Sequence, residues 1–117
     1  MIVLKDVLTL LDGEVLAMGC GLGLECGKVF ASDLMSDVLS FADPGSLLLT
    51  SLANPHTVRT ARLADVAAVV FVQGKRPAAD VVDQAKAINL PLILTRIPMF
   101  DACARISVFM KDGAHGP

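Results

Sequence analysis

Three loops of the sequence gather basic and hydroxyl-bearing side chains that could bind an anion, and each loop follows a short apolar run. The candidate contacts are Thr50, Asn54, His56, Arg59, Lys75, Arg76 and Arg96. Guanidinium and ammonium groups form charge-assisted hydrogen bonds with phosphate oxygens, and hydroxyl groups add neutral donors. Asn54 and Pro55 also mark the start of a helix, whose first N–H groups attract negative charge. The pattern predicts a site for a nucleotide or another phosphorylated small molecule. The alternative interpretation is ordinary solvated loop residues and helix caps.

The elements that must position these loops alternate between strand-like and helix-like segments. Apolar runs at 46–50, 67–72 and 91–95 predict strands, as do shorter segments at 14–18 and 28–31. Apolar spacing predicts helices over 5–11, 32–41, 54–64, 77–89 and 99–110. This alternation is typical of an α/β domain with a short, mainly parallel sheet flanked by helices. In such sheets, ligands usually bind at the carboxyl ends of the strands, where the three loops lie.

Composition predicts one domain with a substantial core. The chain has 117 residues, 54% of them apolar, and a net charge of −2. The apolar share exceeds the usual ~45–50%, so we expect a partner subunit, most simply in a homodimer, to cover part of the surface. The charge gives no reason to expect nucleic acid as a partner. The domain is expected to span 1–110, with a disordered tail at 111–117.

A cytoplasmic location without membrane association is expected from two features. Spanning a bilayer takes about 20 apolar residues, and the longest charge-free stretch, 44–58, is interrupted by prolines and polar residues. The three cysteines have no regular spacing, which fits a reducing compartment better than a disulfide framework.

Two aspartates, Asp33 and Asp37, lie four residues apart in the helix predicted over 32–41. They could form a carboxylate pair or bind a metal, but no histidine or third carboxylate lies nearby in sequence. We expect instead that Ser32 or Asp33 caps the helix and that Asp37 is a solvated residue of its first turn. The inner face of this helix is predicted to comprise Leu34, Met35, Val38 and Leu39.

Glycine and cysteine patterns give weaker signals. The series Gly19-x-Gly21-x-Gly23 follows a strand, but its spacing does not match the dinucleotide fingerprint, and we interpret it as a loop. Cys20 and Cys26 lack the close spacing typical of zinc and redox sites. No nucleophile–base constellation can be argued, so we expect no catalytic residue, no metal and no cofactor.

Several segments of the sequence resemble the DRTGG domain family. They are 32–39 (SDLMSDVL), 42–50 (ADPGSLLLT), 54–58 (NPHTV), 63–70 (LADVAAVV), Gly74, 90–95 (LPLILT) and Phe100. The resemblance covers residues 1–107, and the closest likeness is to small stand-alone DRTGG proteins encoded near iron-only hydrogenase genes. Residues 25–30 (ECGKVF) stand where the name-giving motif would lie, and they lack its paired glycines.

The resemblance implies a compact α/β domain similar to the N-terminal domain of HPr kinase. It further implies a non-catalytic regulatory module, found beside CBS domains in some pyrophosphatases, that tends to mediate dimerisation. Two functional hypotheses follow for this chain. It could be a ligand-sensing module that binds a nucleotide or other phosphorylated anion. Alternatively, it could be an assembly protein for a redox, hydrogenase-related enzyme and bind no small molecule.

Overall fold

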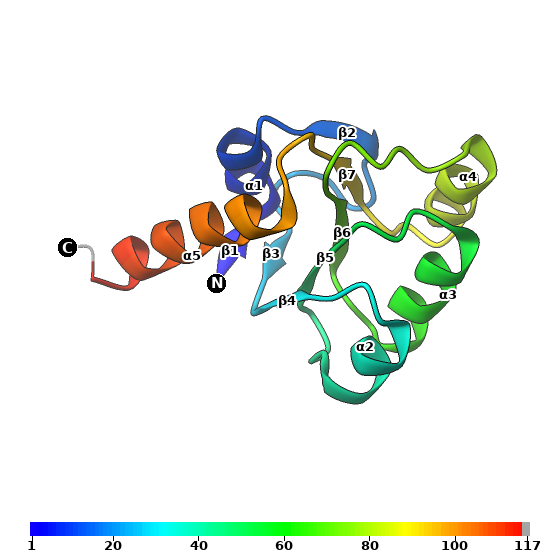
Figure 1. The fold of residues 1–117 in the computed structure, drawn as a ribbon, viewed down its shortest axis with the longest axis horizontal. Coiled ribbons are helices and arrows are strands. Elements are labelled where there is room, and N and C mark those ends of the chain that lie inside the picture. The colour runs from blue at the N-terminus through cyan, green and yellow to red at the C-terminus, as the bar shows by residue number, and fades with distance from the viewer. Residues whose placement is uncertain (116–117) are drawn as a thin grey trace.

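Five strands form the central sheet of the computed structural model, which describes the backbone of residues 1–115 and the side chains of residues 1–112 (Figure 1). In sheet order they are β2 (Glu14–Ala17), β7 (Leu92–Leu94), β6 (Ala68–Phe71), β5 (Leu47–Thr50) and β4 (Val29–Ala31). β4 to β7 run parallel, and β2 pairs antiparallel with β7. The predicted α/β class with a mainly parallel sheet is therefore confirmed.

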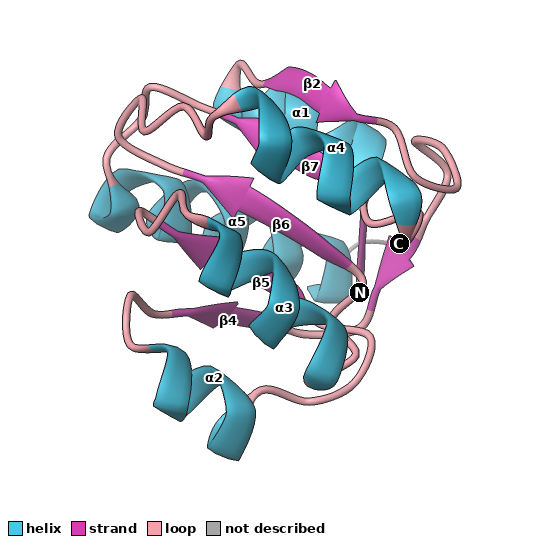
Figure 2. Cartoon of the chain, turned by 90° about the vertical axis from the view of Figure 1, so that its right-hand side faces the viewer, coloured by secondary structure: helices cyan, strands magenta, loops and turns pink. Residues whose placement is uncertain are grey.

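Among residues 1–115, five helices cover the sheet on both faces. They are α1 (Leu4–Leu11), α2 (Met35–Phe41), α3 (Pro55–Leu63), α4 (Ala79–Ala87) and α5 (Met99–His115). α2, α3 and α4 connect successive parallel strands and lie on one face, whereas α1 and α5 lie on the other (Figures 1 and 2). The shared face follows from topology, because crossovers between parallel strands are right-handed and these strands are added in one direction across the sheet.

Alternation along the strands divides the core into two layers. In β5, Leu47 and Leu49 face the layer built with α1 and α5, whereas Leu48 faces the layer built with α2, α3 and α4. All three leucines are completely buried. β5 is therefore buried on both sides, as its run of three leucines predicts.

The beginning of α2 differs from its prediction. The helix starts at Met35, and Leu34 occupies the cap position without a side-chain hydrogen bond. Ser32 accepts a hydrogen bond from the Leu34 amide in the preceding turn, and the Asp33 carboxylate binds elsewhere, so neither residue caps the helix. As a consequence Leu34 and Leu39 are exposed, and the predicted inner face is correct only for Met35 and Val38.

Two further differences concern short or terminal elements. β1 (Ile2–Val3) and β3 (Glu25–Cys26) form a small antiparallel ladder that the sequence did not predict, because two-residue strands carry no periodicity. α5 continues past the predicted end at residue 110 to His115. A single Gly113 costs a helix only about 1 kcal/mol, so it does not stop the helix. Residues 116–117 of the predicted tail lie outside the described residues.

No helix among residues 1–115 combines the length and apolar character that crossing a bilayer requires.

The glycine-rich loop after β2 has a structural role, in line with its interpretation as a loop. Its Leu22 and Leu24 carbonyls accept hydrogen bonds from the Lys5 and Leu4 amides, two of the first amides of α1. Gly19 has a φ of +60°, and a Cβ atom there would lie 2.6 Å from Pro91 Cδ and 2.9 Å from Pro91 N. Both the backbone conformation and the close approach to Pro91 therefore require glycine at this position.

We expect Gly19→Ala to lower the free energy of unfolding by about 2–4 kcal/mol, because it combines left-handed backbone strain with a steric clash. Gly23→Ala is the matched control. A Cβ atom at Gly23 meets nothing within 4 Å, so this variant should lie within about 0.5 kcal/mol of wild type. Chemical denaturation measures both variants. Equal stabilities of the two would contradict the steric role of Gly19.

Candidate functional site

The loops that follow β5, β6 and β7 leave the same edge of the sheet. Thr50 pairs in register with Phe71, and Phe71 pairs with Leu94, so the three parallel strands end side by side. The predicted site residues are therefore delivered to one edge. The loops after β6 and β7 enclose a polar pocket, whose lining residues include none from the loop after β5.

This pocket has a volume of about 350 Å³. Its lining residues are Leu11, Asp12, Glu14, Gly74, Arg76, Leu94, Thr95, Arg96 and Ile97. It lies where the antiparallel strand β2 joins β7, so the end of α1 and the start of β2 form one wall and the loops after β6 and β7 form the other. The two predicted arginines Arg76 and Arg96 thus meet in a single polar cavity.

Hydrogen bonds of the backbone and of the Thr95 hydroxyl hold the two loops together. The Thr95 hydroxyl donates a hydrogen bond to the Leu11 carbonyl (2.6 Å) and accepts one from the Ile97 amide (3.2 Å). The Gln73 amide donates to the Ile97 carbonyl, and the Gly74 amide donates to the Thr95 carbonyl. Gln73 and Gly74 both have positive φ, as a tight turn with two left-handed residues requires. These contacts fix the position from which Arg76 and Arg96 extend.

An ion pair crosses the pocket wall. The Arg76 guanidinium donates two hydrogen bonds to the Glu14 carboxylate, at 2.6 and 3.1 Å. The hydrogen bond from Arg76 lowers the pKa of Glu14 more than desolvation raises it, and the charges of Arg76 and Arg96 lower it further. Reciprocally, Glu14 raises the pKa of Arg76. Among the residues whose side chains the structure describes, Arg96 forms no salt bridge. Arg96 is therefore the cation of this pocket that can accept an anion without first losing a carboxylate.

Two predicted contacts at the first loop have structural partners instead. Thr50 is completely buried, and its hydroxyl donates a hydrogen bond to Asp33 (2.9 Å). The side chain of Asn54 accepts a hydrogen bond from the Thr57 amide (3.3 Å) and so caps α3, as the Asn-Pro signal predicts. The prediction of Thr50 as a ligand contact needs correction, because its hydroxyl is committed to Asp33 and is inaccessible.

The remaining predicted contacts are exposed and lie outside the pocket. His56 and Arg59 lie on α3, and Lys75 lies in the loop after β6. None of the three is among the lining residues. Of the seven predicted contacts, the pocket therefore brings together Arg76 and Arg96.

Asp33 links β4 to the loop after β5. Its carboxylate accepts hydrogen bonds from the Ser51 amide (2.6 Å), the Ser51 hydroxyl (2.6 Å) and the Thr50 hydroxyl. Partial burial alone would raise the pKa of Asp33, but these hydrogen bonds outweigh it and lower that pKa below its ordinary value. Asp37 lies in the first turn of α2, and no cluster of three metal-ligating side chains occurs among the described residues.

The cysteines lie in different environments. Cys20 is exposed in the glycine-rich loop, Cys26 is completely buried in β3, and Cys103 is half-buried on α5. Burial raises the pKa of the Cys26 thiol to about 11 and also raises the pKa of Cys103. Cys26 is therefore a protonated core residue at neutral pH.

Sequence reasoning missed the two carboxylates of the pocket, Asp12 and Glu14. The signal that could have found them is the position of β2 at the sheet edge beside β7. Periodicity predicts the strand but not its neighbour, so the carboxylates could not be assigned to the site.

Comparison with solved structures shows that the fold recurs in a known regulatory region. The similar structure contains the CBS and DRTGG domains of a Clostridium perfringens pyrophosphatase, complexed with its activator diadenosine tetraphosphate. The TM-score is 0.75 at 18% sequence identity, and the match covers 89% of this chain and 45% of that chain. No protein-family model matches the sequence, and no curated protein matches it. The shared property is thus the fold, which agrees with the DRTGG resemblance of the sequence.

We expect Asp33→Asn to lower the free energy of unfolding by about 1 kcal/mol at pH 7, because the variant loses charge-assisted hydrogen bonds at a partly exposed site. The pKa of Asp33 is lower in the folded state, so its contribution is complete above about pH 4 and is lost as the pH falls through the folded pKa. The difference between wild type and variant should therefore shrink below about pH 4. Urea denaturation across pH measures it. Asp37→Asn is the control, with an expected loss of at most about 0.5 kcal/mol; an equal loss would contradict the role of Asp33.

Thiol labelling should distinguish the three cysteines, since the thiolate is the reactive form. We expect Cys20 to react first with a disulfide reagent at pH 7.5 and Cys103 to react more slowly. Cys26 should react only when the protein unfolds. Rapid labelling of Cys26 in the native protein, located by peptide mass spectrometry, would be inconsistent with its burial.

Proposed function

We propose that this chain is a non-catalytic regulatory module that senses a nucleotide or another phosphorylated anion at the carboxyl edge of its sheet. The observation that carries the proposal is the pocket in which Arg76 and Arg96 meet. A cavity of about 350 Å³ lies at the lower end of the range for small-molecule sites, so it suits the phosphate-bearing part of a ligand. The rest of the ligand extends along the edge towards the N-terminus of α3.

The structural neighbour supports a nucleotide as the ligand class. That regulatory region is complexed with diadenosine tetraphosphate, and it shares the fold of this chain. Linked phosphates need several cations, which Arg76 and Arg96 provide inside the pocket while His56, Arg59 and Lys75 stand outside it. The exposed cations are therefore assigned to the outer part of the ligand.

The chemistry of the lining favours binding over catalysis. Its hydroxyl-bearing residue, Thr95, is buried, and its hydroxyl already donates to the Leu11 carbonyl. Glu14 is held as a carboxylate by Arg76 and so is a weak base. We further propose a cytoplasmic location, because the irregular spacing of the three cysteines fits a reducing compartment better than a disulfide framework.

A thermal-shift titration with ATP, diadenosine tetraphosphate and inorganic pyrophosphate tests the proposal. A ligand at 100 times its Kd stabilises a fold by about 2.7 kcal/mol. We expect Arg96→Ala to weaken binding by about tenfold or more, because it removes the unpaired cation of the pocket. Arg62→Ala, at the opposite end of α3, is the matched control and should bind like wild type. No shift with any of the three probes would reject the nucleotide-sensing role.

Arg59→Ala reports how far the ligand extends. If the ligand reaches α3, this variant should weaken ATP binding and leave pyrophosphate binding unchanged, because pyrophosphate fills only the pocket. Equal effects on both probes would contradict the assignment of Arg59 to the outer part of the ligand.

Glu14→Gln should tighten binding of the same probes by roughly two- to fivefold, because it releases Arg76 from an exposed ion pair and removes a negative charge from the wall. Isothermal titration calorimetry at low ionic strength measures the change. Weaker binding would show instead that Glu14 positions Arg76 for the ligand.

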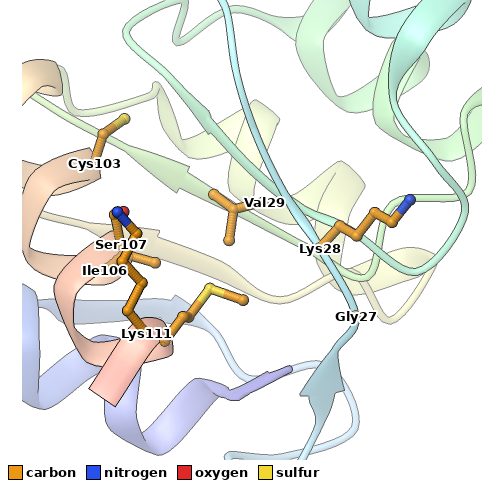
Figure 3. A pocket seen from close by; sticks show the side chains of 8 residues that line it. Gly27, Lys28, Val29, Cys103, Ile106, Ser107 and Lys111 are labelled. Atoms are coloured by element: carbon orange, nitrogen blue, oxygen red, sulfur yellow. The ribbon is translucent and has the colours of Figure 1, made fainter. Parts of the chain in front are cut away.

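A second candidate function is an assembly protein for a redox enzyme. The observation in its favour is an open apolar hollow of about 570 Å³ between β4 and α5, lined in part by Val29, Cys103, Ile106 and Met110 (Figure 3). Lys28 points away from this hollow and pairs with Asp43 at 2.9 Å, whereas Lys111 on α5 also lines the hollow. This function predicts stable association with a partner enzyme and no ligand-induced thermal shift.

A further inference from the structure

The second half of α5 extends away from the sheet and leaves part of its surface uncovered (Figure 1). On the side that faces α1, it forms an open and largely apolar hollow of about 450 Å³. The lining residues are Leu10, Ala104, Arg105, Val108, Phe109 and Asp112, which we call the α5 patch. Val108 is 59% exposed and Phe109 is 36% exposed. An apolar patch on a projecting helix indicates an interaction surface.

The charges of the α5 patch have a self-complementary arrangement. Arg105 and Asp112 are both exposed, and they stand seven residues apart, which is about two helical turns and roughly 10 Å along the axis. They therefore lie on the same side of α5, with Val108 and Phe109 between them. One N–H group of Arg105 donates to the Leu10 carbonyl at 3.0 Å, and the guanidinium has further donors.

We propose that the α5 patch is a homodimer interface, in which α5 packs antiparallel against α5 of a second copy across a two-fold axis. When Val108 lies opposite the partner's Phe109, the same register places Arg105 opposite the partner's Asp112. The two-fold axis repeats this ion pair at the other end of the patch. Ala104 is small and lets the helices approach closely. An apolar centre with one ion pair on each side results.

The charge pattern favours a second copy over an unrelated partner. The patch carries one positive and one negative end, so a partner surface of a single sign would meet one like charge. A second copy related by a two-fold axis satisfies both ends with the same contact, because such an interface uses one patch twice. The interface would also cover part of the apolar surface that the composition predicts to be covered by a partner subunit.

Charge reversal tests this geometry through the oligomeric state. Wild-type protein should sediment as a dimer at micromolar concentration. Arg105→Asp sets two aspartates against each other at both ends of the interface, and Asp112→Arg sets two arginines against each other. Each variant alone should therefore weaken dimerisation at least tenfold. Arg62→Asp, an equal charge change on α3, is the control and should leave the dimer unchanged.

Mixing the two variants gives the decisive result. In a heterodimer of Arg105→Asp with Asp112→Arg, every opposed pair again carries opposite charges. The mixture should therefore dimerise at protein concentrations at which each variant alone is monomeric. The double variant Arg105→Asp/Asp112→Arg should likewise dimerise with itself. Circular-dichroism melting shows whether each variant is folded. If Arg105→Asp does not fold, the loss of the dimer in Asp112→Arg tests the interface by itself.

Three outcomes would overturn the proposal. The first is a wild-type protein that stays monomeric even at a concentration 100 times above the micromolar range. The second is a dimer whose stability is unchanged by Asp112→Arg. The third is a pair of monomeric single variants whose mixture also stays monomeric. None of these outcomes bears on anion binding, which thermal shift measures separately.

Discussion

The handedness of the crossovers is the constraint on which the rest of this structure depends. β4, β5, β6 and β7 follow the same order in the chain and in the sheet, so right-handed connections send α2, α3 and α4 to one face. The other face carries fully buried residues such as Leu47, Leu49 and Val70, and elements outside the parallel series must cover it. α1 and α5 do so. Because α5 is longer than the face it covers, its second half stands free of the sheet.

A threonine hydroxyl accepts a hydrogen bond at the ends of both β5 and β7, but its second partner differs between the two strands. β5 ends at Thr50, and β7 is followed by Thr95; each hydroxyl accepts a hydrogen bond from the amide two residues later. Thr50 then donates to Asp33 and closes the loop against β4, whereas Thr95 donates to the end of α1. At the end of β5, the polar groups of Asp33, Thr50 and Ser51 form hydrogen bonds with one another. At β7 a cavity lies beside the strand end, lined by the end of α1 and by Glu14 at the start of β2, which pairs with Leu94.

Local features of the sequence were predictable, and spatial neighbours were not. The largely apolar β5 and β6, and the Asn54 cap of α3, carry signals that need no tertiary information, and the structure contains them. The prediction that Asp33 caps α2 was wrong. Its carboxylate could either cap the helix or bind the loop after a neighbouring strand, and only the position of β5 decides between these two roles. Glu14 was missed for the same reason, since its role depends on the pairing of β2 with β7.

The two arginines of the polar pocket differ in their ion pairing, and this difference affects how the pocket could bind an anion. Arg76 is paired with Glu14, whereas Arg96 has no ion-pair partner among the described side chains. In the proposed function, a phosphate would compete with Glu14 for Arg76, and this competition would lower the affinity for the phosphate. The same competition would couple a ligand to β2, because Glu14 ties this edge strand to the loop after β6. Such coupling is what a sensor needs, since a ligand shifts a conformational equilibrium only through contacts that differ between the two states.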